Sequence, residues 1–179
     1  MPSRRQFAVT AIGRDRPGIV AAVSHALLEL EGNIEDSQMS ILRGHFAVML
    51  IVAVPEAGAG EVARRLGSVR DELGLEAITV EPIDELEAEA PHPTHVLTVY
   101  GADHPGIVSA VAGTLAAEGV NITDLNTRLA GSEDRPLYAM MLELALGDVD
   151  PDTLLERLRE VGDRESVEVS LRALEAEAL

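Results

Sequence analysis

The sequence GRDRPGIV, at residues 13–20, stands between an apolar run and a helical pattern of apolar residues. It recurs 88 residues later as GADHPGIV, at residues 101–108, in the same setting. The dipeptide Asn33-Ile34 recurs at the same spacing as Asn121-Ile122. A self-match of this length indicates two copies of one structural unit. The chain has 179 residues, which is enough for two small domains.

The first copy predicts the element order strand–helix–strand–strand–helix–strand, which is the βαββαβ order of ferredoxin-like folds. Apolar runs and alternation predict strands at residues 7–12, 34–42, 45–54 and 75–81. Pro17 is expected at the first position of the first helix, and Gly74 is expected to end the second. The buried face of that second helix is expected to comprise Val62, Leu66, Val69 and Leu73.

The strand at residues 45–54 is apolar on both faces. One face carries Phe46, Val48, Leu50 and Val52, and the other carries Ala47, Met49, Ile51 and Ala53. A strand of this kind is covered on both sides. Helices can cover one face, and we expect a second sheet or a partner chain on the other.

The second copy predicts strands at residues 94–100, 121–130, 137–146 and 166–171 and a helix at 105–118. Its hairpin loop is expected at residues 131–136. Asp150 caps the last helix, Pro151 takes its first position, and Gly162 follows its end. Residues 172–179 are expected to be a frayed helical tail.

The predicted fold is therefore α+β, with two ferredoxin-like domains, each an antiparallel four-stranded sheet with two helices on one face. The domains are expected at residues 1–81 and 94–179. Residues 82–93 form an acidic linker that ends in Pro91 and Pro93, with partial helix expected from Ile83 to Ala90. This division leaves no segment for a helix-turn-helix or a separate catalytic domain.

The composition restricts both chemistry and partners. The net charge is −17, from 31 acidic residues against 14 basic ones, all of which are arginine. Such a charge repels nucleic acid and anionic membranes, although it is also compatible with a simple role in solubility. The chain has no cysteine, and its longest apolar run, Phe46 to Val54, is too short to span a membrane. No signal peptide precedes the first strand, so we expect a cytoplasmic protein.

The repeated loop has the chemistry of a site for a small anion. The first amide groups of a helix lack internal partners and lie at the positive end of the helix dipole. Gly18 and Gly106 lack a Cβ, so a ligand can approach the backbone closely. A carboxylate at Asp15 or Asp103 could pair with an ammonium group. Together these groups meet the minimum requirement for recognising a free α-amino acid.

The same residues also have a purely structural interpretation. Asp at such a turn often caps a helix, and Pro-Gly often only sets the backbone shape. Asn33 and Asn121 could contribute an amide contact or simply be turn residues. Recurrence does not separate these interpretations, because duplication copies structure and function together.

The pattern D-x-P-G-I-V after a short strand, with N-I about fifteen residues on, resembles the ACT domain. The resemblance covers residues 6–81 and 94–172, and a two-ACT chain is most similar to the glycine cleavage system transcriptional repressor group. It implies βαββαβ modules that bind amino acids between the first loop of one unit and a neighbouring unit. It also implies a homo-oligomer, a dimer formed by pairing of the ACT sheets. The matching positions are Gly13, Asp15, Pro17, Gly18, Ile19, Asn33 and Ile34, then Gly101, Asp103, Pro105, Gly106, Ile107, Asn121 and Ile122.

These observations favour a non-enzymatic regulatory protein that senses a small amino acid such as glycine or serine. It would act through a protein partner, and its acidity argues against direct contact with DNA. The alternative is an accessory subunit of an enzyme with no small-molecule ligand. An enzyme is disfavoured, because Cys and Lys are absent and no acid, base and nucleophile come together. We assign no metal or cofactor: His92 and His95 have metal-ligand spacing but no clear third ligand.

Overall fold

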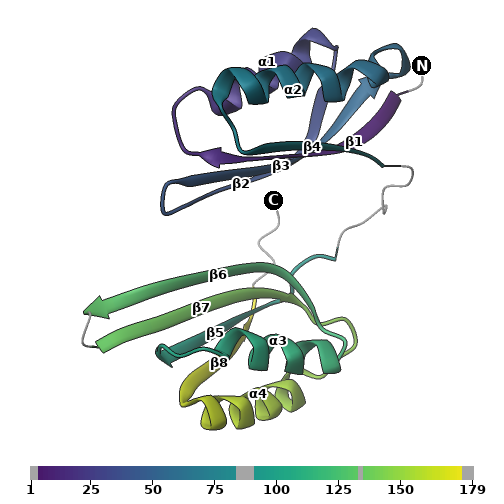
Figure 1. Ribbon diagram of the computed structural model, residues 1–179. Helices are drawn as coiled ribbons and strands as arrows, with labels where there is room; N and C mark the ends of the chain where they lie inside the picture. The colour runs from purple at the N-terminus through teal and green to yellow at the C-terminus, as the bar shows by residue number, and fades with distance from the viewer. Residues whose placement is uncertain (1–3, 84–90, 133–134, 175–179) are drawn as a thin grey trace. The chain divides into compact units, whose positions relative to one another are not determined.

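The computed structural model describes residues 4–83, 91–132 and 135–174. The chain divides into two compact units, Met1–Glu87 and Ala88–Leu179. Each unit is an antiparallel four-stranded sheet with two helices on one face (Figure 1). The α+β ferredoxin-like fold predicted from the sequence is confirmed in both units.

The first unit follows the order of the predicted elements. Its strands lie in the order β2-β3-β1-β4, so that β2 and β4 form the edges. The elements are β1 (Arg4–Arg14), α1 (Ile19–Glu29), β2 (Asn33–Leu42), β3 (His45–Pro55), the 3₁₀ turn η1 (Glu56–Glu61), α2 (Val62–Leu73) and β4 (Ala77–Ile83).

The second unit repeats this arrangement with the strand order β6-β7-β5-β8. Its elements are β5 (His95–Ala102), α3 (Ile107–Ala117), β6 (Asn121–Ser132), β7 (Arg135–Ala145), α4 (Pro151–Glu165) and β8 (Val167–Ala173). Asp150 caps α4 as predicted, since its carboxylate accepts a hydrogen bond from the Thr153 amide at 2.9 Å.

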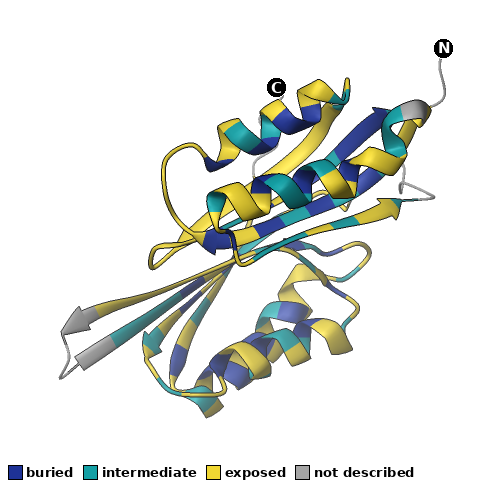
Figure 2. Ribbon diagram, turned by 45° about the horizontal axis from the view of Figure 1, so that its top comes forward, coloured by how far each residue is buried: buried dark blue, intermediate teal, exposed yellow. Residues whose placement is uncertain are grey.

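The core of each unit lies between the sheet and its helices, where the buried residues follow the central strands and the inner helix faces (Figure 2). The predicted inward face of β3 is confirmed, because Phe46, Val48, Leu50 and Val52 are all buried. On the opposite face Met49 is 52% exposed. The sheet or partner chain that we expect over this second face therefore remains a proposal.

Several predicted boundaries are wrong. The first helix begins at Ile19, two residues after Pro17, because Gly18 takes a left-handed conformation and becomes the N-cap. For the same reason the helix expected at 105–118 begins at Ile107, after the N-cap Gly106. The hairpin loop at 131–136 is shorter than expected, since Ser132 pairs with Arg135 in the β6–β7 ladder. The last helix does not stop at Gly162 but continues to Glu165.

Two further expectations fall partly on residues that are not described. Of the helix expected from Ile83 to Ala90, residues 84–90 lie outside the described residues, and Ile83 belongs to β4. Of the helical tail expected at 172–179, residues 175–179 lie outside them, whereas Arg172 and Ala173 belong to β8.

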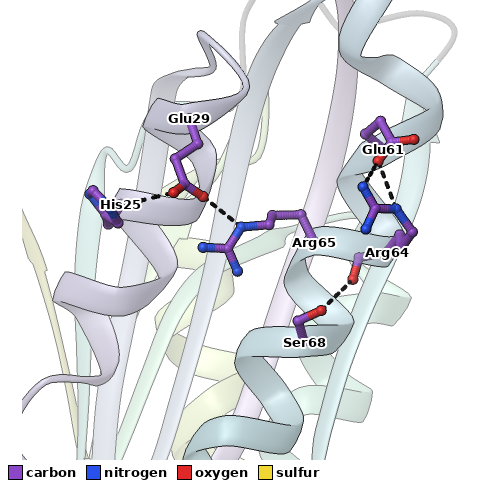
Figure 3. Close-up of polar contacts among 6 residues, drawn as sticks. All are labelled: His25, Glu29, Glu61, Arg64, Arg65 and Ser68. Atoms are coloured by element: carbon purple, nitrogen blue, oxygen red, sulfur yellow. Dashed lines mark hydrogen bonds and ion pairs between the residues drawn. The ribbon is translucent and has the colours of Figure 1, made fainter.

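An ion pair joins the two helices of each unit on their exposed side. In the first unit the Nε of Arg65 on α2 donates to Oε2 of Glu29 on α1 at 2.6 Å (Figure 3). This hydrogen bond is the main reason that the pKa of the Glu29 carboxyl lies below its ordinary value. In the second unit Arg157 of α4 pairs with Glu118 at the end of α3. Exposed pairs of this kind stabilise a fold only slightly, so the buried apolar faces hold the helices in place.

Gly162 allows α4 to pack closely against the start of β8. A Cβ at this position would lie 2.7 Å from the Val167 carbonyl oxygen and 3.0 Å from Val169 Cγ2. Gly113 on α3 has no described atom within 4 Å of such a Cβ. Glycine is therefore required by packing at the first position and not at the second.

We expect Gly162→Ala to lower the free energy of unfolding by about 1–3 kcal/mol, because the new methyl group overpacks the helix–strand contact. Gly113→Ala is the matched control and should raise it by about 0.5–1 kcal/mol, since alanine favours the helix. Urea unfolding followed by circular dichroism measures both. Equal effects of the two substitutions would contradict the close packing of α4 on β8.

Candidate functional site

The loop between β1 and α1 is held by the backbone. The Asp15 amide donates to the Gly44 carbonyl at 2.9 Å, which ties the loop to the turn between β2 and β3. Gly18 has φ of 99°, and its carbonyl accepts the first helical hydrogen bond from Ala22 at 2.9 Å. A side chain would be strained at this φ, so the backbone conformation itself requires glycine at position 18.

The start of α1 is open to a ligand. No side chain among the described residues caps it, and its first turn contains no acidic residue. The first amide groups of the helix therefore lack helical partners and lie at the positive end of its dipole. The residues that begin the helix, Gly18 to Ala21, line a cavity of about 230 Å³ together with Asp15, Arg16 and Pro17. Four of the residues predicted from the sequence, namely Asp15, Pro17, Gly18 and Ile19, thus line one hollow.

The floor of this cavity is apolar and was not predicted. It consists of Met39 and Ile41 from β2 and Phe46 from β3. Register explains why these side chains meet there: Met39 pairs with Val48 and Ile41 with Phe46, so both point to the helix side of the sheet. They lie on an edge strand and are about half exposed, at 50% and 47%. The turn at Arg43-Gly44 was the sequence signal that could have fixed this register.

Asn33 and Ile34 lie at the other end of β2. They line a separate open cavity of about 510 Å³ with Gly32 and the outer side of α1. A strand rises ~3.3 Å per residue, so this end of β2 is far from the loop at Asp15. A register shift follows Ile34, and another follows Ile122 in the second unit. The repeated Asn-Ile dipeptide therefore marks a β-bulge in both copies.

Gly13 and Gly101 have a packing role. A Cβ on Gly13 would lie 2.7 Å from Leu75 Cδ2, and one on Gly101 would lie 2.8 Å from Val167 Cγ1. Each glycine lets the end of the first strand of its unit pass close to the segment that enters the last strand. Neither residue is among those that line the cavity at Asp15.

The second loop repeats this backbone conformation. Gly106 has φ of 114°, and no described side chain caps α3. Asp103, Pro105 and Gly106 thus precede α3, of which Ile107 is the first residue, as their counterparts precede α1, and Asn121 and Ile122 begin β6. At the position of Arg16 the second loop has His104, whose ring contacts Glu165 at the end of α4.

The two units also differ beside the loop. Gly13 pairs with Phe46 in the first sheet, whereas Gly101 pairs with Tyr138 in the second. Partial burial raises the pKa of the Tyr138 hydroxyl, and the negative charge of Asp103 raises it further. A phenol therefore stands near the Asp103 carboxylate where the first unit has an apolar ring. Neither Phe46 nor Tyr138 was identified as a site residue from the sequence.

Within residues 4–83, 91–132 and 135–174, no cluster of three or more His, Asp or Glu side chains could hold a metal ion. In that same part of the chain, no helix is long and apolar enough to cross a membrane.

Comparison with protein families identifies both units. An ACT domain matches residues 5–80, and a second ACT domain matches residues 95–163. The chain is a tandem ACT-domain protein. The glycine cleavage system transcriptional repressor of Escherichia coli is 26% identical to it over 147 residues, which are 80% of this chain and 75% of the repressor.

Other relatives match one or both ACT domains. UPF0237 protein MK1213 of Methanopyrus kandleri is 43% identical over 72 residues, 39% of this chain and 80% of that protein. Phosphoserine phosphatase SerB2 of Mycobacterium tuberculosis is 28% identical over 176 residues, 96% of this chain. The chain spans only 41% of that phosphatase.

Two solved structures cover nearly the whole chain. An unknown protein from Galdieria sulphuraria matches with a TM-score of 0.79 and 28% identity, over 97% of this chain and 100% of that one. A candidate glycine cleavage system transcriptional repressor matches with a TM-score of 0.76 and 17% identity, over 96% and 98% of the two chains. The second likeness is evidence for the tandem ACT fold alone.

We expect Gly18→Ala to destabilise the first ACT domain by about 1–2 kcal/mol, because a Cβ at positive φ strains the start of α1. No described atom lies within 4 Å of the new methyl group, so a steric clash would not account for the loss. Chemical unfolding measures the effect. Gly67→Ala on α2, where space is also open, serves as the control and should be neutral or stabilising. An unchanged stability of Gly18→Ala would contradict the left-handed N-cap.

Proposed function

We propose that this is a cytoplasmic, non-enzymatic regulatory protein that binds a small amino acid, such as glycine or serine, at its β1–α1 and β5–α3 loops. It acts through a protein partner in the transcriptional control of amino-acid metabolism. The proposed ligand-contacting residues are the matched positions of the two loops, with Asp15 and Asp103 as the partners of the ligand ammonium group. Asn33, Ile34, Asn121 and Ile122 belong to the proposed site only if a neighbouring unit brings the start of β2 or β6 to a loop.

One observation carries the proposal: the uncapped start of α1 and Asp15 line the same open cavity. The amide groups suit a carboxylate, and Asp15 suits an ammonium group. An α-amino acid carries both charges on neighbouring atoms. The floor of Met39, Ile41 and Phe46 would contact whatever side chain the ligand has. The relationship to the Escherichia coli repressor supports the regulatory part of the proposal.

The negative net charge of the chain supports action through a protein partner. A net charge of −17 opposes direct binding to DNA phosphates, so an effect on transcription needs an intermediary. A shift of a DNA fragment by the purified protein at physiological salt would contradict this part of the proposal.

Thermal unfolding in the presence of each proteinogenic amino acid at millimolar concentration tests the ligand. A ligand at ~100 times its Kd adds ~2.7 kcal/mol to the stability of the native state. We expect one or two amino acids to raise the Tm by roughly 5–10 °C, at ~2–4 °C per kcal/mol. If none does, the accessory-subunit alternative is favoured, and co-purification of a partner enzyme is then the expected result.

Substitution assigns the ligand to the loops. The double variant Asp15→Ala, Asp103→Ala should lose the Tm shift produced by the active amino acid, because the ammonium group loses its partner in both loops. A matched control is Glu56→Ala with Asp148→Ala, which removes one exposed carboxylate from each domain at the end of the sheet away from the loop. An undiminished shift in the first double variant would refute the site, even if the amino acid itself binds.

We further propose that the chain forms a homodimer through its sheets. The edge strand β2 is exposed at all ten positions, and Met49 on the outer face of β3 is 52% exposed. Edge strands carry backbone groups that are free to pair with another chain.

Sedimentation equilibrium over a range of concentrations tests the dimer. For a chain of 19.0 kDa we expect a mass that approaches twice this value and falls on dilution. Met49→Lys, which places a charge on the outer face, should shift the equilibrium towards the monomer if the sheets pair face to face. A monomer at all concentrations would refute the proposed pairing.

A further inference from the structure

His104 makes the second ligand loop different from the first. Its Nε2 lies 2.7 Å from the backbone carbonyl oxygen of Glu165, and its Nδ1 lies 3.1 Å from that of Pro105. The Glu165 carboxylate lies 3.8 Å from Nδ1. The imidazole ring therefore connects the β5–α3 loop to the last residue of α4, which is 61 positions away in the sequence.

All the oxygens around this ring accept hydrogen bonds. A backbone carbonyl and an ionised carboxylate cannot donate, so each of these contacts needs an N–H on the imidazole. A neutral imidazole has one N–H, and an imidazolium has two. The neutral ring would direct a nitrogen lone pair at a carbonyl oxygen on one side. Only the doubly protonated ring satisfies both contacts.

The end of α4 adds to the preference for a positive charge. Glu165 is the last residue of the helix, and its carbonyl belongs to the group that has no partner within a helix. A cation at this end interacts favourably with the helix dipole. The Glu165 carboxylate also lies 3.7 Å from the position of a Cβ on Gly106, the N-cap of α3. Loop, α3 start and α4 end thus meet around one ring.

Most of the groups around His104 favour its protonated form and so raise the pKa of the imidazole. The hydrogen bond to the Glu165 carbonyl raises the pKa of the imidazole above its ordinary value of 6.5, and the bond to the Pro105 carbonyl adds to this rise. The carboxylates of Glu165 on α4 and Asp103 on the loop also raise it, while partial burial opposes them. The positive start of α3 opposes them too. Tyr138 on β7, whose pKa is raised above 10.0, stays uncharged near neutral pH.

The first domain does not have this contact. Arg16 takes the place of His104 and lines the open cavity. Gly13 packs on Leu75 as Gly101 packs on Val167, so Leu75 and Val167 are equivalent positions in the two domains. Counted back from them, Leu73 at the end of α2 is the equivalent of Glu165 at the end of α4. The first loop is tied instead by its backbone, through the Asp15 amide and the Gly44 carbonyl.

We propose that His104 is a pH-sensitive latch: its imidazolium fastens the β5–α3 loop to the end of α4, and deprotonation weakens this fastening while the β1–α1 loop is unaffected. The latch is a property of the second domain alone and does not depend on the proposed amino-acid ligand. It makes the two loops of one chain respond differently to a change of pH near neutrality.

Two-dimensional NMR of the full chain between pH 5.5 and 9 tests the latch. The imidazole of His104 should titrate with a midpoint above 6.5. The amide signals of Gly106 and Ser166 should move with the same midpoint, because they share peptide groups with the Pro105 and Glu165 carbonyls. The amide of Gly18, the counterpart of Gly106, is the internal control and should not follow this titration.

Two variants separate the latch from a merely structural histidine. In His104→Ala the titration of the Gly106 and Ser166 amides should disappear. In Glu165→Gln the midpoint of His104 should fall but stay above 6.5, since the backbone carbonyl is retained. Because the folded-state pKa is raised, the stabilisation by His104 is fully present below pH 6.5 and is lost as the pH rises through the folded-state value. The Tm difference between wild type and His104→Ala should therefore be larger at pH 6 than at pH 9.

His25→Ala is the matched control, because His25 also lies near a glutamate, with Nε2 3.6 Å from Glu29 Oε1, but on the surface of α1. A His104 midpoint at or below 6.5 would overturn the proposal. So would amide signals of Gly106 and Ser166 that do not follow the titration of the ring. Absence of any amino-acid ligand would leave these readouts unchanged and would bear only on the proposed function.

Discussion

Both ACT domains depend on a helix that starts at a glycine with positive φ. In neither domain does a described side chain cap this start, so the first amide groups of the helix have no side-chain partner there. Gly13 packs against Leu75 just before β4, and Gly101 packs against Val167 at the start of β8. Each domain therefore presents helix-start amide groups that have no partner within the helix, and the surrounding side chains decide what those groups can bind.

The side chains around the two loops differ, although both helices begin after a glycine in the left-handed conformation. The first loop faces an apolar floor of Met39, Ile41 and Phe46, and it has Arg16 at its rim. The second has Tyr138 in the place of Phe46 and a histidine that reaches the end of α4. A ligand that suits one loop therefore meets different chemistry at the other. The copies share a scaffold and need not share a ligand or an affinity.

Much of this fold could be predicted because its signals are local. The repeat, the order of elements and the inward face of β3 follow from periodicity and from the positions of Gly and Pro. The end of the last helix could not be predicted from Gly162. The sequence does not distinguish a glycine that allows close packing of a strand on a helix from a glycine that ends the helix. Gly18 was interpreted as a point of ligand approach, whereas its φ shows that the backbone needs it first.

The site could be predicted from the sequence only in part, because some of its residues come together through long-range contacts. Residues 15–19 are contiguous, so their proximity in one loop could be predicted from the sequence. Met39 and Ile41 join them only through the register of the β2–β3 ladder, and Glu165 joins His104 only through the packing of α4. Contacts of this range determine whether each loop is open or fastened. The main difference between the two loops thus comes from Glu165, which is distant from His104 in the sequence. His104 can act as a latch because the end of α4 supplies the oxygens that accept its hydrogen bonds.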